Sequence, residues 1–155
     1  MTRFGWRIFG VLLVVIAGFG LMVRAADHPT ERWHINPVDA VRTGKPNDYV
    51  AAPEGAVAAE IDRLLLSAPA DPLMAFDRVA RSAPRTNVVA GSVAEGFITY
   101  VQRSALIGFP DYVSVVRIDS TPPSIAIWSR SRYGYSDMGV NKARIDAWLQ
   151  EAGFE

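Results

Sequence analysis

Residues 86–132 read TNVVAGSVAEGFITYVQRSALIGFPDYVSVVRIDSTPPSIAIWSRSR. Within this stretch, the residue types favoured in β-strands (Val, Ile, Thr, Tyr and Trp) concentrate in four segments, 86–92, 96–104, 112–118 and 124–132. Connections as short as those between them join sequential strands as antiparallel neighbours. The stretch therefore predicts an antiparallel sheet of four strands, and residues 60–67 are a candidate fifth strand.

Helical periodicity flanks the predicted sheet on both sides. Asp71 and Pro72 are a typical N-cap and first helical residue, and the helix that they begin ends at Pro84. A second helix is predicted from Asn141, as its N-cap, to Gly153. Apolar residues recur on one face of each helix, at Leu73, Phe76, Val79 and Ala80 in the first and at Ile145, Trp148, Leu149 and Ala152 in the second. The predicted fold class is α+β, with an antiparallel sheet of four to five strands packed against two helices.

The N-terminal segment is far more apolar than the rest of the chain. Residues 8–23, IFGVLLVVIAGFGLMV, carry no charge and lie between Arg7 and Arg24. We predict that residues 4–23 form an N-terminal transmembrane helix in contact with a lipid bilayer, and a cleaved signal peptide is the alternative. Arg3 and Arg7 favour a cytoplasmic N-terminus. In a bacterial cell, this orientation gives a single-pass protein of the inner membrane with its C-terminal domain in the periplasm.

Three regions follow from these patterns. Residues 1–24 are predicted to be the membrane anchor or signal peptide, residues 25–53 a juxtamembrane tether, and residues 54–155 a single α+β domain. The tether is polar, and prolines at 29, 37, 46 and 53 interrupt regular structure within it. Trp33, in the tether, either rests on lipid headgroups or caps the folded domain.

Composition excludes several classes of function. With 16 basic and 16 acidic side chains, the chain presents no positive field for nucleic acid. It has no cysteine, and its two histidines, His28 and His34, both lie in the predicted tether. A Ser-His-Asp triad and a multi-histidine metal site are therefore not available to the domain, and no glycine-rich phosphate loop occurs. We predict no catalytic residue, no metal site and no cofactor.

Several arginines lie within the predicted strands. Alternation along a strand places Trp128, Arg130 and Arg132 on one face of residues 124–132, and Arg103 ends an equivalent face of residues 96–104. Two interpretations stay open. These arginines either form ion pairs with Asp111 and Asp137 in nearby turns, or they converge on an anionic ligand, such as a lipid phosphate or a carboxylate, in a groove on the face away from the helices.

Several motifs resemble one known family. They are Arg85–Asn87 (RTN), Ala90–Ser92 (AGS), Thr99–Ser104 (TYVQRS), Gly108–Tyr112 (GFPDY), Ser129–Asp137 (SRSRYGYSD) and Gly139–Asn141 (GVN). Together they resemble domain of unknown function 1499 (DUF1499), a bacterial and plastid family, over residues 70–149. The resemblance implies the α+β architecture and a location in the cell envelope as a membrane-anchored member. It implies no activity and transfers no catalytic residue.

The same motifs supply the candidate ligand-binding residues, which are Arg103, Asp111, Arg130, Arg132, Tyr135, Ser136, Asp137 and Asn141. The leading hypothesis is a non-enzymatic domain that binds an anionic or amphipathic small molecule or lipid through an arginine-lined groove. One alternative is an accessory or structural subunit of a membrane complex, with another protein of that complex as its partner. A second alternative is a hydrolase or isomerase that uses Asp111 or Asp137 as its acid or base.

Overall fold

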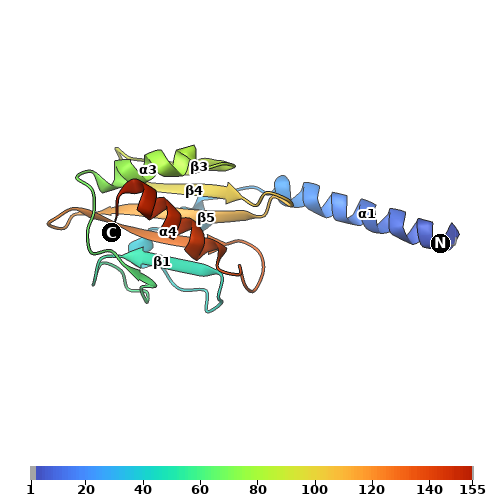
Figure 1. Cartoon of the computed structure of the whole chain (residues 1–155), viewed down its shortest axis with the longest axis horizontal. Helices are drawn as coiled ribbons and strands as arrows, with labels where there is room; N and C mark the ends of the chain where they lie inside the picture. Colours follow the sequence, from blue (N-terminus) through green and yellow to red (C-terminus); the bar gives the residue numbers. More distant parts are fainter. Residues whose placement is uncertain (1–2, 155) are drawn as a thin grey trace.

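The computed structural model describes residues 3–154, apart from the side chains of residues 3–5 and 7. An N-terminal helix leads into a domain built on one sheet (Figure 1). In chain order the elements are α1 (Arg3–Arg24), α2 (Thr30–Trp33), the 3-10 helix η1 (Pro37–Asp39), β1 (Asp48–Ala52), β2 (Arg63–Leu64), α3 (Pro72–Ser82), β3 (Thr86–Ser92), β4 (Phe97–Arg103), β5 (Pro110–Ile118), β6 (Ser124–Ser131) and α4 (Val140–Ala152).

The sheet has six strands in the order β2-β1-β6-β5-β4-β3. The predicted α+β class is confirmed, and β3 to β6 pair as the antiparallel neighbours expected from their short connections. The predicted number of four to five strands is wrong. β2 falls within the candidate fifth strand at 60–67, β1 is the additional strand, and these two strands pair in parallel.

β1 escapes sequence analysis because three of its five residues are weak strand formers. Its sequence is DYVAA, and Asp and Ala are both depleted in strands. It lies inside the predicted tether, between two of the prolines there. Antiparallel pairing with β6, with Val50 opposite Trp128, holds it in the sheet. Tertiary pairing therefore outweighs local propensity at this segment.

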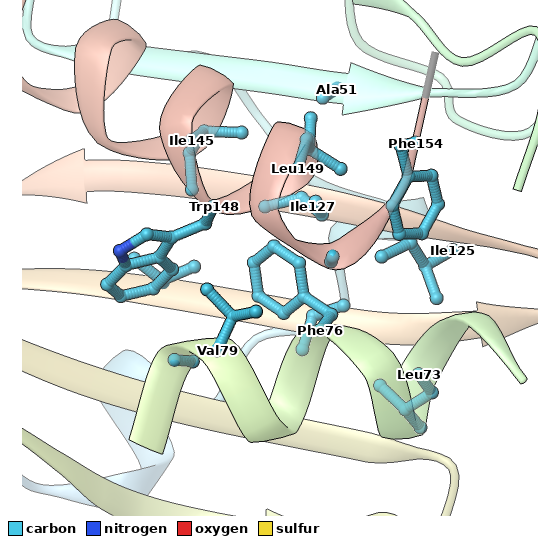
Figure 2. Packing of buried hydrophobic residues seen from close by; sticks show 14 of the residues in the cluster. Ala51, Leu73, Phe76, Val79, Ile125, Ile127, Ile145, Trp148, Leu149 and Phe154 are labelled. Carbon is cyan, nitrogen blue, oxygen red and sulfur yellow. The ribbon is translucent and has the colours of Figure 1, made fainter. Parts of the chain in front are cut away.

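Helices α3 and α4 cover one face of the sheet, and the main hydrophobic core lies between them and the strands (Figure 2). Phe76 from α3 packs against Trp148 from α4, with ring centroids 5.8 Å apart. α3 begins as predicted, because Asp71 Oδ1 accepts a hydrogen bond from the Met74 backbone N–H at 3.1 Å. Burial of each such large apolar side chain stabilises the fold by about 1.5–3 kcal/mol.

The tether covers part of the opposite face of the sheet. The Trp33 ring stacks on Tyr112 of β5 at a centroid distance of 3.8 Å, and the His34 ring stacks on Phe97 of β4 at the same distance. Trp33 is only 6% exposed. Of the two alternatives left open for Trp33, the structure shows that it caps the folded domain.

Helix α1 extends away from one end of the domain (Figure 1). Its apolar side chains from Ile8 to Phe19 are mostly exposed. Among the described residues, no helix has the length and apolar character required to cross a membrane, so the predicted N-terminal transmembrane helix is not found. The uncharged run between Arg7 and Arg24 rises about 24 Å as a helix, which is less than the roughly 30 Å of a bilayer's hydrocarbon core.

His28 links the tether to the sheet through its neutral form. Arg103 Nη2 donates to His28 Nε2 at 3.0 Å, so Nδ1 carries the proton that hydrogen-bonds the Tyr112 hydroxyl at 2.6 Å. Burial lowers the pKa of His28, and the charges of Arg103 and Arg132 lower it further. Burial also lowers the pKa of His34.

Acid should therefore destabilise the packed tether. Because the pKa of His28 is lower in the folded protein than the ordinary 6.5, the unfolded chain binds this proton more readily. Stability is then fully present above pH 6.5 and is lost as the pH falls from there towards the folded-state value. We expect His28→Gln and His34→Gln each to reduce the fall in melting temperature between about pH 7 and pH 5, and the double variant to reduce it most. If the melting temperature fell equally with pH in the parent protein, the two single variants and the double variant, the two histidines would not be the source of the acid sensitivity.

Candidate functional site

A pocket of about 290 Å³ lies between the tether and the C-terminal end of β6. Four of its lining residues are basic: Arg32, Lys45, Arg130 and Arg132. Two tryptophans, Trp33 and Trp128, supply apolar walls, and the other lining residues are Thr43, Asn47, Ser131 and Gly134. We call this hollow the basic pocket. Its lining holds four cationic side chains and no carboxylate.

Arg130 is the most buried of the four basic residues, at 3% exposure. Its Nη1 donates to Ser114 Oγ at 3.2 Å, and its Nη2 donates to the Trp33 carbonyl at 2.5 Å. Its guanidinium also lies over the Trp128 ring, 4.0 Å from the centroid. These contacts hold the guanidinium in one orientation at the boundary between sheet and tether.

The charge of Arg130 has no ion-pair partner among the described residues. The buried carboxylate of Asp48 is committed to Arg42 at 3.0 Å, and it also accepts from Trp128 Nε1. Burial lowers the pKa of Arg130 to about 10, with Asp48 and Tyr112 opposing that shift. The guanidinium is therefore still charged at neutral pH, and its positive charge is buried without a paired anion.

Arg132 lies beside Arg130 at the more exposed side of the basic pocket. Its Nη1 donates to the Asp27 carbonyl at 2.5 Å and to the Tyr112 hydroxyl at 3.4 Å. Its guanidinium lies 5.8 Å from the centroid of the Trp33 ring. Like Arg130, it forms no ion pair with the described carboxylates. These two arginines were predicted to share one face of a strand, and the structure brings both to one pocket.

Arg103 lies elsewhere, at the base of α1. Its Nη1 donates to the carbonyls of Val23 and Gly108 at 3.1 and 3.0 Å, and its Nη2 contacts His28. It does not line the basic pocket. Its role in the structure is to fasten the end of α1 and the β4–β5 turn to the sheet.

The remaining candidate residues cluster around the start of α4, on the helix side of the sheet. Asp111 pairs with Arg144 at 2.6 Å, and not with Arg103, Arg130 or Arg132. Asp137 caps α4, because its Oδ1 and Oδ2 accept from the backbone N–H groups of Gly139 and Asn141. Ion pairs of Asp111 and Asp137 with the strand arginines, one of the two interpretations left open, are therefore absent from the described residues.

Asn141 is fully buried, inside α4 instead of at its predicted N-cap position. Its Nδ2 donates to the Asn47 carbonyl and to Ser131 Oγ, each at 3.0 Å. Its Oδ1 accepts from Ser129 Oγ at 2.6 Å and from Arg144 Nη1 at 2.8 Å. We call these contacts the Asn141 network. Asn141 joins α4, β6 and the tether.

Tyr135 and Ser136 lie in the turn that leads into α4. Tyr135 is 71% exposed, and Ser136 Oγ accepts a hydrogen bond from the Met138 N–H. Neither residue lines the basic pocket. Of the eight candidates, the structure gathers Arg130 and Arg132 into one pocket and places the other six outside it.

The pocket residues that come from the tether were not predicted from the sequence. The backbone of Asp48 lies opposite that of Arg130 in the pairing of β1 with β6. This pairing brings the preceding residues Thr43, Lys45 and Asn47 to the pocket. Asn47 Nδ2 donates to the Gly134 carbonyl at 2.9 Å and fixes this loop against the turn after β6. No local pattern in residues 43–47 signals this placement. Within residues 3–154, no group of three His, Asp or Glu side chains is arranged to hold a metal ion.

Loss of the Asn141 network should destabilise the fold. Asn141→Ala removes four hydrogen bonds at a fully buried position, and leaves donors of Arg144 and Ser129 without their partner. We expect the free energy of unfolding to fall by about 3 kcal/mol. The measurement is denaturant unfolding of the purified full-length protein. Asn87→Ala, at an exposed position on β3, is the matched control and should change stability by less than about 0.5 kcal/mol. If the two substitutions lowered the free energy of unfolding equally, the Asn141 network would contribute no more to stability than an exposed side chain does.

Comparison with known proteins gives one match. The family model described as "Protein of unknown function (DUF1499)" matches residues 35–151, which is most of the chain. No curated protein and no solved structure matches the chain. The match begins well before the residues 70–149 that carry the sequence motifs, and so includes β1 and β2. The chain therefore belongs to the DUF1499 family.

Proposed function

We propose that this domain binds a small anionic molecule, or the anionic headgroup of a lipid, in the basic pocket, and that it catalyses no reaction there. The observation that carries the proposal is the buried, charged guanidinium of Arg130, which meets no carboxylate among the described residues. A buried charge without a partner costs several kcal/mol, because removal from water is not repaid by an ion pair. A bound anion offsets that cost.

The chemistry of the basic pocket suits a phosphate or a carboxylate. Guanidinium groups donate two parallel hydrogen bonds to such anions, and Arg130 and Arg132 lie side by side at one wall. The volume of about 290 Å³ is at the lower limit of small-molecule sites. A headgroup-sized anion is the ligand class that fits.

The arrangement of carboxylates supports a binding role over an enzymatic one. A general base must lie within hydrogen-bond reach of its substrate. Asp111 is held by Arg144 on the other side of the sheet, and Asp137 is committed to the start of α4. The hydrolase or isomerase alternative requires one of these groups beside the strand arginines, and neither lines the basic pocket.

We further propose that α1 associates with a lipid bilayer. Its support is the row of exposed apolar side chains along α1, which no other part of the described chain covers. Location at the inner membrane with the domain in the periplasm stays a prediction from the arginines that flank this segment. A lipid headgroup in the basic pocket would agree with that location.

The test of the basic pocket is calorimetric titration of the full-length protein, in a non-ionic detergent that carries no competing anion, with inorganic phosphate and with glycerol 1-phosphate. We expect Arg130→Met and Arg132→Met each to weaken binding by about 10-fold to 100-fold, because a hydrogen bond to a charged group contributes about 1.5–3 kcal/mol. Arg117→Met is the matched control. It removes the same charge from an exposed position on β5, outside the basic pocket, and should leave affinity unchanged.

Stability separates a binding role from a structural role for Arg130. Methionine keeps the length of the side chain and removes the buried charge. Ser114 Oγ also donates to the Trp33 carbonyl, at 3.3 Å, so this acceptor keeps a partner in Arg130→Met. We expect the free energy of unfolding to change by less than about 1.5 kcal/mol. A variant that unfolds, or that binds phosphate as tightly as the parent protein, would overturn the proposal.

A further inference from the structure

Two loops lie at the end of the domain from which α1 departs (Figure 1). One is the β4–β5 turn, residues 104–109, and the other is the β6–α4 turn, residues 132–139. Both follow strands that run towards this end, since β4 and β6 are parallel to each other on either side of the antiparallel β5. We call these two turns the loop surface.

Direct contacts join α1 to the loop surface. Arg24 Nη2 donates to the Leu106 carbonyl at 2.8 Å. The ring of Phe19 in α1 meets Phe109 at a centroid distance of 6.1 Å, and Phe109 in turn meets Tyr133 at 5.9 Å. Aromatic contacts therefore run without a break from the apolar helix through one loop to the other.

The tips of both loops are large apolar side chains open to solvent. Leu106 is 88% exposed and Met138 is 94% exposed. Met138 also has a φ of +55°, in the left-handed region that favours glycine. Glycine at this position would therefore suit the fold better than methionine does. Neither Leu106 nor Met138 buries its side chain, so neither contributes to the hydrophobic core. Exposed apolar side chains next to an exposed apolar helix are typical of a surface that contacts a membrane or another apolar surface.

The charges around the loop surface favour an anionic partner. The β4–β5 turn carries no charged residue. Arg24, Lys45 and Arg132 lie around the two loops, and Arg24 and Lys45 are exposed. The carboxylate of Asp137, the one acid in the β6–α4 turn, is occupied by the N–H groups at the start of α4. Exposed apolar tips beside three basic side chains and one exposed acid, Asp27, match the headgroup region of a bilayer that contains anionic lipids.

From these observations we infer that the loop surface is a second membrane contact. In this arrangement, Leu106 and Met138 insert into the headgroup region of the bilayer beside α1. This inference rests on the proposed association of α1 with a bilayer, and it does not depend on what the basic pocket binds. The end of the domain next to α1 then faces the membrane and contacts it, so the domain has a fixed orientation relative to the bilayer.

The chain contains no cysteine, so a single introduced cysteine can be labelled at one chosen position. Leu106→Cys and Met138→Cys variants of the full-length protein are labelled with the polarity-sensitive fluorophore NBD. They are reconstituted into vesicles of equal parts phosphatidylcholine and phosphatidylglycerol. We expect both labels to emit at shorter wavelength than in detergent-free buffer, and to be quenched by lipids that carry a nitroxide near the headgroup.

Two matched labels make the result decisive. Leu66→Cys replaces an exposed leucine at the opposite end of the sheet, roughly 30 Å away along β5, and should show neither change. Val15→Cys, near the centre of α1, is read with lipids that carry the nitroxide on the acyl chain, and it reports whether the helix itself meets lipid. Quenching at position 15 without quenching at positions 106 and 138 overturns the second contact and leaves the α1 proposal standing. No quenching at position 15 overturns the α1 proposal, and this inference with it.

Discussion

The carbonyl oxygen of Trp33 fastens the tether to the sheet. It accepts hydrogen bonds from Arg130 on β6 and from Ser114 on β5, and the Trp33 ring stacks on Tyr112 in the same place. Together with the stacking of His34 on Phe97, this attachment keeps the tether over one face of the sheet, where Trp33 lines the basic pocket. The packing of Trp33 with Val101 and Tyr112, and the orientation of Arg130, also depend on it. The position of one tryptophan in an irregular segment thus controls the candidate site.

The two faces of the sheet are stabilised in different ways. Below α3 and α4 the core is almost wholly apolar, apart from the Asn141 network and the Asp111–Arg144 ion pair at one end. Under the tether, polar and charged groups are buried with the aromatic rings: Ser114, Thr99 and Arg130 are all under 4% exposed. The helix side therefore provides most of the apolar burial, while the tether side holds the groups that recognise ligand in our proposal.

The sequence predicted the parts of the fold that depend on local pattern. The cap at Asp71, the four strands from 86 to 131 and the helix that contains Ile145 and Trp148 all carry clear signals, and alternation correctly placed Trp128 and Arg130 on one face. β1 was missed because its pairing with β6 determines its structure. Lys45, Thr43 and Asn47 were missed for the same reason, since only that pairing brings them to Arg130. The partner of Asp111 proved to be Arg144, on a helix whose position no local pattern predicts.

Packing of the tether also has a consequence for anyone who prepares a shortened protein. The match to the family begins at residue 35, which is where a fragment would ordinarily be cut. A fragment cut there lacks both Trp33 and His34, so the Tyr112 ring, the Val101 side chain and the Arg130 guanidinium lose their cover. The boundary of the folding unit therefore lies upstream of the boundary of the family. A fragment for crystallisation or spectroscopy should begin no later than Asp27, whose carbonyl holds Arg132.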